Sequence, residues 1–272
     1  MSRDDRLEAF FSRPREEALA DPGAAERGAE LLAALESGEI RAASRSPDGE
    51  WSASAWVKAG ILAVFTLCDL EEYPAWPGGA VDKSAFAPRV MTKADRVRVV
   101  PGGSSVRRGA RLCPGAVIMP PAFVNVGAWV GAGTMVDSHA LVGSCAQVGE
   151  RVHLSAGAQL GGVLEPTGAR PVIVEDECFI GALAGVFEGF VVRKRAVVAP
   201  GVRLSASTVV WDLVRERELR GELPEDAVVV PGSRPAKGAW AADRGLALYA
   251  PCIVKYRDSR TTAATALEEA LR

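Results

Sequence analysis

Residues 106–165 read VRRGARLCPGAVIMPPAFVNVGAWVGAGTMVDSHALVGSCAQVGERVHLSAGAQLGGVLE. One position in every six of this stretch is aliphatic, ten times in succession. These positions are Val106, Leu112, Ile118, Val124, Val130, Val136, Val142, Val148, Leu154 and Leu160. An α-helix and an ordinary strand do not have a period of six, whereas short strands joined by sharp turns do. The stretch therefore predicts a parallel β-helix, in which equivalent positions stack coil upon coil.

The period of six is interrupted once and then resumes. We call these aliphatic positions anchors. The next anchor after Leu160 is Val174, and the series then continues at Ile180, Val186, Val192, Val198, Leu204 and Val210. The additional residues, 166–173, contain the proline and glycine of a loop rather than the pattern of a core strand. We expect an excursion over 166–173, which is either part of a binding face or a tolerated surface insertion.

The change of pattern along the chain predicts three regions. Residues 1–100 form an N-terminal helical domain, with helices expected over 15–20, over 24–35 before a glycine stop at Gly38, and over 54–67. Residues 101–211 form the β-helix. Residues 212–272 are expected to contribute short strands and a closing helix over 261–271, which together cap the open end of the solenoid.

Composition limits the classes of partner. The 272 residues include 32 basic and 34 acidic side chains, so neither nucleic acid nor an anionic membrane is expected to attract the chain. Five scattered cysteines without a Cys-x-x-Cys pair indicate a reduced compartment, and neither cysteines nor histidines cluster as a metal site would require. The start of the chain lacks the apolar core of a signal peptide, and we expect a cytoplasmic protein.

Several strings in the β-helix region are more specific than the period itself. Residues 133–137 read GTMVD, residues 142–149 read VGSCAQVG, and residues 161–166 read GGVLEP. With these strings, nearly the whole chain resembles the tetrahydrodipicolinate N-succinyltransferase family of hexapeptide-repeat acyltransferases.

The resemblance implies a mainly β fold, a left-handed parallel β-helix with an N-terminal α-helical domain and a small C-terminal capping region. It also implies a homotrimer with active sites between neighbouring prisms and a role in diaminopimelate and lysine biosynthesis. The partners would be a small dicarboxylate acceptor and succinyl-CoA as co-substrate, with no permanently bound cofactor.

Two site residues follow from the resemblance. Arg98, in the string Arg98-Val99-Val100-Pro101, matches the family's substrate-binding arginine, and Asp137 matches the aspartate at the reaction centre. A guanidinium can hold a carboxylate of the acceptor through two parallel hydrogen bonds. A carboxylate beside the attacking amine can orient that amine and accept its proton. Without the resemblance, Arg98 would be interpreted as a surface charge and Asp137 as a turn residue.

The number of residues in one coil predicts which residues stack beside Asp137. With eighteen residues per coil and the excursion removed, Asp137, Ser155, Gly181 and Ala199 stack in one column. At about 4.8 Å per coil this column is about 14 Å long. We expect Ser155, Gly181 and Ala199 to bind the pantetheine arm of the co-substrate, with Ser155 also near the acceptor. The alternative is that the six-residue repeats favour small residues at this position for packing.

The sequence departs from the family pattern at one active-site position. The family's second active-site glutamate falls on Gly185, whereas Glu188 lies three residues further on, in a column with Ser144 and Gly162. We hypothesise that Glu188 is catalytic and that Ser144 contacts the acceptor. A structural role for Glu188 at a subunit boundary is the alternative.

The sequence is also compatible with two other functions. Acetyl-CoA could replace succinyl-CoA, because pocket depth decides the length of the donor. The chain could also be a noncatalytic trimeric scaffold, because the glutamate is missing at Gly185. His139, His153 and Cys145 are interpreted as packing or hydrogen-bonding residues rather than as bases or nucleophiles.

Overall fold

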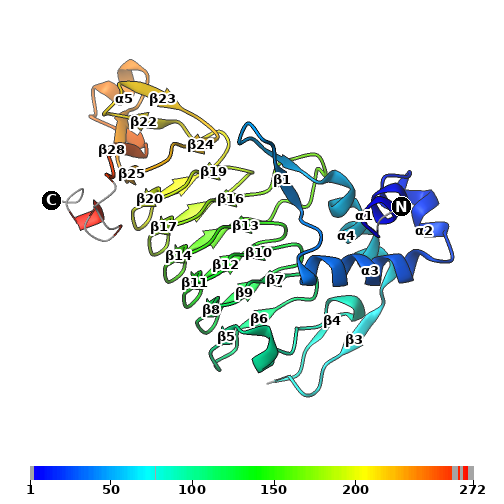
Figure 1. Ribbon diagram of the computed structural model, residues 1–272. Helices are drawn as coiled ribbons and strands as arrows, with labels where there is room; N and C mark the ends of the chain where they lie inside the picture. Colours follow the sequence, from blue (N-terminus) through cyan, green and yellow to red (C-terminus); the bar gives the residue numbers. More distant parts are fainter. Residues whose placement is uncertain (1–2, 77, 259–262, 264–265, 269–272) are drawn as a thin grey trace.

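The computed structural model describes residues 3–76, 78–258, 263 and 266–268. Its body is a prism whose three faces are parallel β-sheets of very short strands, with the helices packed along one side (Figure 1).

The prism strands of sheet 1 are β5 (Arg98–Val99), β8 (Val117–Ile118), β11 (Met135–Val136), β14 (His153–Leu154), β17 (Phe179–Ile180), β20 (Val197–Val198) and β25 (Ala227–Val230). Those of sheet 2 are β6 (Ser105–Val106), β9 (Phe123–Val124), β12 (Leu141–Val142), β15 (Gln159–Leu160), β18 (Gly185–Val186) and β21 (Arg203–Leu204). Those of sheet 3 are β7 (Arg111–Leu112), β10 (Trp129–Val130), β13 (Gln147–Val148), β16 (Ile173–Val174), β19 (Val191–Val192) and β24 (Glu222–Leu223).

The aliphatic anchors form the core of the prism. Val136 pairs with Leu154, and Leu154 pairs with Ile180, so these side chains stack along the axis and are fully buried. Each coil also donates backbone hydrogen bonds to the next coil. Burial of one anchor in every six residues thus accounts for the period, and the predicted parallel β-helix is confirmed.

Close stacking of the coils leaves no room for a side chain at some corners. A Cβ added at Gly131 would lie 2.2 Å from the carbonyl oxygen of Gly149 in the next coil. By contrast, a Cβ added at Gly168 in the excursion would meet nothing within 4 Å. The corner glycine is therefore fixed by backbone contact between coils, and the loop glycine is not.

Both ends of the prism differ from the expected limits. β5 already pairs with β8, so the prism begins at Arg98 rather than at residue 101. At the other end, β22 (Val210–Asp212) does not stack on β19; it pairs with β23 (Arg217–Leu219), and β24 takes the place on β19. The boundary at 211 was wrong, because the coils continue to Val230. Val210 is buried in the prism core as expected of an anchor, but it reaches that core from the hairpin and does not stack on β19.

The excursion leaves the prism after Leu160 and rejoins it at Ile173, which is the first residue of β16. The limit at 173 therefore falls one residue inside a strand, because buried Ile173 packs with Ala43 and Val191. The loop is also attached to the helical domain. The buried Lys58 ammonium donates a hydrogen bond to the carbonyl oxygen of Ala169, and burial lowers the pKa of Lys58.

Four helices make up most of the N-terminal domain, and they share a core that includes Leu7, Leu31, Ile61 and Val64. They are α1 (Arg3–Phe11), α2 (Arg15–Ala20), α3 (Ala24–Ser37) and α4 (Ala55–Leu67). α3 ends at Gly38, whose φ of 82° is the left-handed conformation expected of a glycine stop. The three predicted helices are confirmed, whereas α1 was not predicted.

Short hairpins and turns connect this domain to the prism. One hairpin, β1 (Ala43–Arg45) with β2 (Trp51–Ala53), lies along sheet 3 (Figure 1). A second hairpin and two 3-10 turns follow, namely β3 (Leu70–Glu72), β4 (Val81–Lys83), η1 (Ser84–Phe86) and η2 (Lys93–Asp95).

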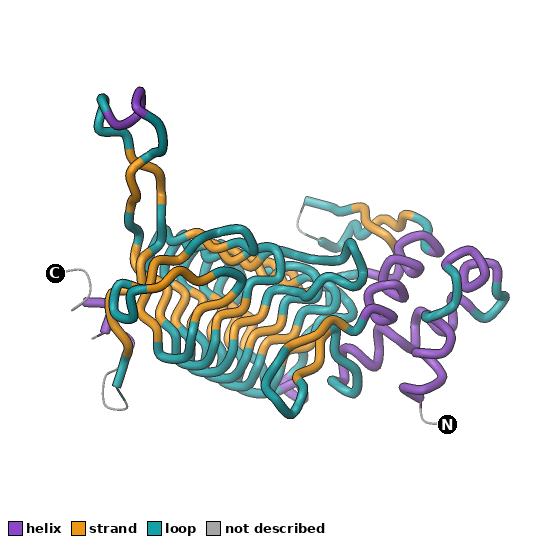
Figure 2. Tube along the Cα trace, turned by 90° about the horizontal axis from the view of Figure 1, so that it is seen from above, coloured by secondary structure: helices purple, strands orange, loops and turns teal. Residues whose placement is uncertain are grey.

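The C-terminal region covers one end of the prism. β28 (Cys252–Tyr256) pairs antiparallel with β25, and an arm of β26 (Ser233–Pro235), α5 (Ala239–Ala242) and β27 (Ala247–Tyr249) projects from the body (Figure 2). The closing helix expected over 261–271 lies largely outside the described residues. Within the described part of the chain, no helix combines the length and the apolarity needed to cross a bilayer.

Candidate active site

The corner between sheets 1 and 2 carries the aspartate expected at the reaction centre. Asp137 follows β11 and is half-buried, and its Oδ1 accepts a hydrogen bond of 2.7 Å from the backbone N–H of Ser138. Among the described residues, nothing donates a hydrogen bond to Oδ2 and no cation pairs with the carboxylate. One carboxylate oxygen thus holds the turn, and the other is available to a ligand.

Arg98 lies in sheet 1 two coils below Asp137, and its side chain reaches toward this corner. Its Nη2 lies 3.6 Å from Sδ of Met119, and Met119 stacks one coil below Asp137. The Arg98 side chain is exposed and forms no ion pair with any described carboxylate. The structure therefore places an unpaired guanidinium and an available carboxylate on one edge of the prism, with the Met119 side chain beside the guanidinium.

The column of residues above Asp137 stacks in the expected order. The N–H groups of Asp137, Ser155 and Gly181 donate to Leu154, Ile180 and Val198 respectively. Ser155 is half-buried and remains accessible next to Asp137.

The upper part of this column cannot serve as the expected track for the pantetheine arm. Ala199 has 0% exposure, because β25 pairs with β20 and covers it, and Gly181 is buried as well. A Cβ at Gly181 would lie 2.5 Å from the backbone nitrogen of Pro200, so packing explains this glycine. The expectation that Gly181 and Ala199 contact the co-substrate is therefore wrong, because both are buried.

Glu188 lies at a different corner, between sheets 2 and 3. It is exposed, has a φ of 54°, and lines a cavity of about 490 Å³ together with Glu165 and the excursion residue Ala169. Ser144 stacks in the same column as Gly162 and Glu188, but it is only 7% exposed. Glu165 was not selected from the sequence, although it belongs to the GGVLEP string.

The Phe187 ring lies beside Gly185, where the resemblance implies a glutamate. A Cβ added at Gly185 would lie 2.4 Å from Cε2 of Phe187. The Phe187 ring therefore occupies the space into which a glutamate at residue 185 would project, and the ring also lines the cavity with Glu188. No sequence signal pointed to this replacement, because an aromatic residue at a half-buried position of the six-residue repeat is ordinary.

The remaining polar candidates differ in their surroundings. His153 packs against Phe179, with ring centroids 5.2 Å apart, and His139 is exposed on its turn. Cys145 is fully buried, and burial raises the pKa of its thiol to about 12, so it cannot supply a thiolate near neutral pH. No group of three or more potential metal ligands occurs among the described residues.

Comparisons with known proteins agree with this arrangement. Family models described as tetrahydrodipicolinate N-succinyltransferase N-terminal and as hexapeptide repeat of succinyl-transferase match residues 6–67 and 171–206. The 2,3,4,5-tetrahydropyridine-2,6-dicarboxylate N-succinyltransferase of Nitrobacter winogradskyi is 44% identical over 253 residues, covering 89% of this chain and 88% of the relative. The chain belongs to the tetrahydrodipicolinate N-succinyltransferase family.

Other members of this family are similarly close. The enzyme of the same name from Methylobacterium nodulans is 49% identical over 251 residues, covering 89% of this chain and 87% of the relative. A Campylobacter jejuni structure solved under the name 2,3,4,5-tetrahydropyridine-2-carboxylate N-succinyltransferase aligns with a TM-score of 0.53 and 19% identity, over 84% of this chain and 62% of that chain. That likeness concerns the fold alone. With the hexapeptide repeats, it identifies the prism as a left-handed parallel β-helix.

Proposed function

We propose that this chain transfers the succinyl group of succinyl-CoA to the amino group of tetrahydrodipicolinate, in its ring-opened, hydrated form 2-amino-6-oxopimelate. The reaction belongs to diaminopimelate and lysine biosynthesis. The observation that supports this most strongly is the 44% identity, over 89% of the chain, to a relative named as the N-succinyltransferase for this dicarboxylate. The amine nitrogen bonds to the thioester carbonyl carbon, the carbon–sulfur bond breaks, and the proton of the amine is transferred so that coenzyme A leaves as the thiol.

Asp137 is proposed as the group that orients the amine and accepts its proton. The attacking nitrogen must be unprotonated and must lose a proton as the amide forms. Because no described residue donates to Oδ2 of Asp137, this oxygen can contact the nitrogen while Oδ1 stays bonded to Ser138. Ser155, one coil above, is proposed to contact the acceptor and the thioester end of the donor.

Arg98 is proposed to bind a carboxylate of the acceptor. Replacing it with methionine keeps part of the packing against Met119 and removes the guanidinium. Because hydrogen bonds to charged groups contribute about 1.5–3 kcal/mol, Arg98→Met is expected to raise KM for the acceptor about tenfold to a hundredfold. Steady-state kinetics with the acceptor varied at saturating succinyl-CoA measures this change. Arg220→Met, which replaces an exposed arginine in a loop, is the control. An equal rise of KM for the acceptor in that variant would contradict the assignment.

A second copy of the chain is proposed to complete the site. Asp137 and Glu188 lie at opposite ends of sheet 2 in one chain, on two different corners of the prism. The acceptor amine and the donor thioester can meet both groups only where a corner of one prism faces a corner of another. A homotrimer with sites between its subunits, and with Glu188 and Ser144 supplied by the neighbour, satisfies this requirement.

The identity of the donor is tested directly. Thiol release is measured with succinyl-CoA and with acetyl-CoA, each with and without the acceptor. We expect acceptor-dependent release with succinyl-CoA. Faster release with acetyl-CoA would instead support an N-acetyltransferase. If the folded, oligomeric protein releases thiol with neither donor, a noncatalytic scaffold would be supported. The reason to consider a scaffold is that the Phe187 ring occupies the place where the resemblance implies a glutamate.

The surroundings of the reaction are part of the proposal. Succinyl-CoA is proposed as a co-substrate that binds and leaves in each cycle, and the chemistry requires no permanently bound cofactor. The cytoplasm supplies both substrates, and it suits five cysteines that are all free in this structure.

A further inference from the structure

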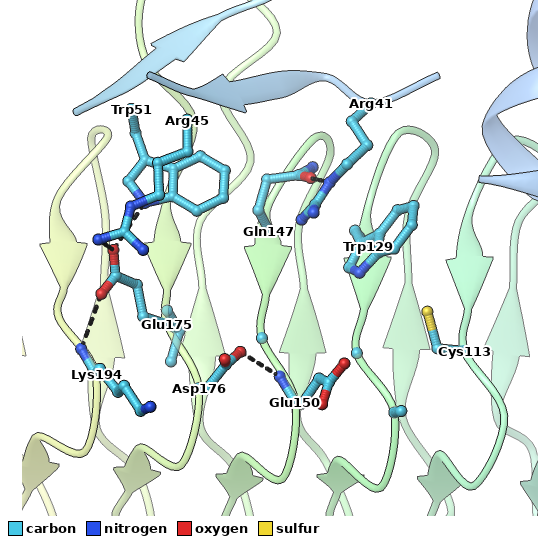
Figure 3. Close-up of a pocket in the computed structure, with 14 residues that line it drawn as sticks. Arg41, Arg45, Trp51, Cys113, Trp129, Gln147, Glu150, Glu175, Asp176 and Lys194 are labelled. Carbon is cyan, nitrogen blue, oxygen red and sulfur yellow. Dashed lines mark hydrogen bonds and ion pairs between the residues drawn. The ribbon is translucent and has the colours of Figure 1, made fainter. Parts of the chain in front are cut away.

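A second cavity lies away from the corners that carry Asp137 and Glu188. It lies between the β1–β2 hairpin and the corner from sheet 3 to sheet 1, is partly open to solvent, and has a volume of about 250 Å³ (Figure 3). The residues that matter for its chemistry are Arg41, Trp129, Gln147, Glu150, Glu175 and Asp176. The reaction proposed above makes no use of this cavity.

Arg41 presents an unpaired guanidinium to the cavity. Its Cζ lies 4.0 Å from the ring centroid of Trp129, and its Nε donates a hydrogen bond of 3.0 Å to Oε1 of Gln147. Among the described residues, no carboxylate forms an ion pair with Arg41 and its other nitrogens have no hydrogen-bond partner. Burial lowers the pKa of Arg41, and the charge of nearby Asp176 opposes this shift.

The guanidinium is also held rigidly. Gln147 is 1% exposed, and its Nε2 donates to the carbonyl oxygens of Gly127, Cys145 and Ala146. Its Oε1 is therefore fixed in orientation and directed to Arg41. With the indole of Trp129 on one face of the guanidinium, the remaining donors of Arg41 point into the cavity (Figure 3).

Asp176 is the complementary charge. Its Oδ1 accepts a hydrogen bond of 2.8 Å from the backbone N–H of Glu150, and no described cation pairs with it. In Figure 3 it lies across the cavity from Arg41. The other charges around the cavity are paired: Arg45 with Glu175 at 3.5 Å, Glu150 with Arg151 at 2.8 Å, and Lys194 with Glu177 at 3.9 Å. One cation, Arg41, and one anion, Asp176, therefore remain without an ion-pair partner among the described residues.

We propose that this cavity binds a free α-amino acid, with its carboxylate on Arg41 and its ammonium group on Asp176. A guanidinium can bind a carboxylate through two parallel hydrogen bonds, and a carboxylate can accept hydrogen bonds from an ammonium group. A zwitterion satisfies both unpaired charges at once, whereas a simple anion satisfies only Arg41. The volume of about 250 Å³ is below the range of about 300–1,000 Å³ found for sites of drug-sized ligands, which favours a single small metabolite.

The first experiment measures the melting temperature of the full-length protein with each common α-amino acid in turn at millimolar concentration. A ligand that binds only the folded state stabilises it by RT ln(1 + [L]/Kd) and so raises the melting temperature, more at higher ligand concentration. We expect a rise with at least one amino acid. The N-acetyl derivative of that acid, which lacks the ammonium group, and its amide, which lacks the carboxylate, should each give a much smaller rise.

Variants then assign the contacts. Asp176→Asn keeps the acceptor for the N–H of Glu150 and removes the charge, and Arg41→Lys keeps a charge and removes the planar donor pair. Each is expected to weaken binding of the selected amino acid at least about tenfold by calorimetric titration. Asp48→Asn and Arg220→Met, at exposed positions, are the matched controls and should leave the affinity unchanged.

Three outcomes would overturn the proposal. The first is that no amino acid binds. The second is that the N-acetyl derivative binds as tightly as the free amino acid, which would indicate a simple anion site. The third is that both cavity variants keep the affinity of the unmodified protein. The melting temperatures of the unliganded variants show whether each has folded. Acyl transfer is not the readout, so failure of this proposal is distinguishable from failure of the proposed enzymatic function.

Discussion

Asp137→Asn is expected to lower the rate constant for acyl transfer about a hundredfold to ten-thousandfold, the range typical of losing a general acid or base. The amide oxygen can still accept the hydrogen bond from Ser138 N–H, so the turn should keep its shape. The amide cannot accept the proton of the attacking amine. Thiol release from succinyl-CoA at saturating acceptor measures the change in kcat, and Asp48→Asn at an exposed turn is the control.

Mixing subunits extends this test to the division of the site between chains. If Asp137 of one chain acts with Glu188 of another, trimers reassembled from Asp137→Asn and Glu188→Gln chains contain some sites with both groups intact. Activity should then recover in the mixture although each parent trimer is impaired. Full turnover by Glu188→Gln alone would remove Glu188 from the catalytic assignment. Unchanged turnover by Asp137→Asn would remove the proposed base.

Gly131→Ala is expected to destabilise the protein by about 3 kcal/mol, at the upper end of typical overpacking costs. The added Cβ would lie 2.2 Å from the carbonyl oxygen of Gly149, which is backbone and cannot rotate away. Relief requires the coils to separate, which weakens the hydrogen bond of Gly131 N–H to Val148. Equilibrium unfolding in denaturant at fixed protein concentration measures the loss.

Gly168→Ala is the matched control for this prediction. The same methyl group is added within the excursion, where nothing lies within 4 Å of the new Cβ. Surface substitutions of this kind usually change stability by about 0.5 kcal/mol or less. Equal destabilisation by the two substitutions would mean that contact between coils is not what requires a glycine at residue 131.

The sequence predicted the prism well because its strongest constraint is periodic. Each anchor must be buried by the anchors one coil above and below, so the need for an aliphatic residue repeats along the chain. The same pattern could not reveal the hairpin at Val210, because burial requires an apolar residue whichever strand covers it. α1 was missed because its nine residues bury only Leu7 and Phe11, too few for a clear helical pattern.

The candidate active site was predicted in part for a related reason. Stacking of equivalent positions correctly placed Ser155 beside Asp137, because that relation depends only on the length of a coil. It could not show that Ala199 is covered, because β25 comes from residues much later in the chain. Contacts between distant segments, such as Arg41 on Trp129, likewise depend on three-dimensional packing.

The direction of β28 has a consequence for how these molecules behave at high concentration. A solenoid of parallel strands could in principle grow head to tail, with the last coil of one molecule serving as the template for the first coil of another. On sheet 1 the strand beyond β25 runs antiparallel, and β28 is followed by β22 and β23. An incoming parallel strand therefore finds no matching register there, and the fold disfavours fibre growth along the prism axis.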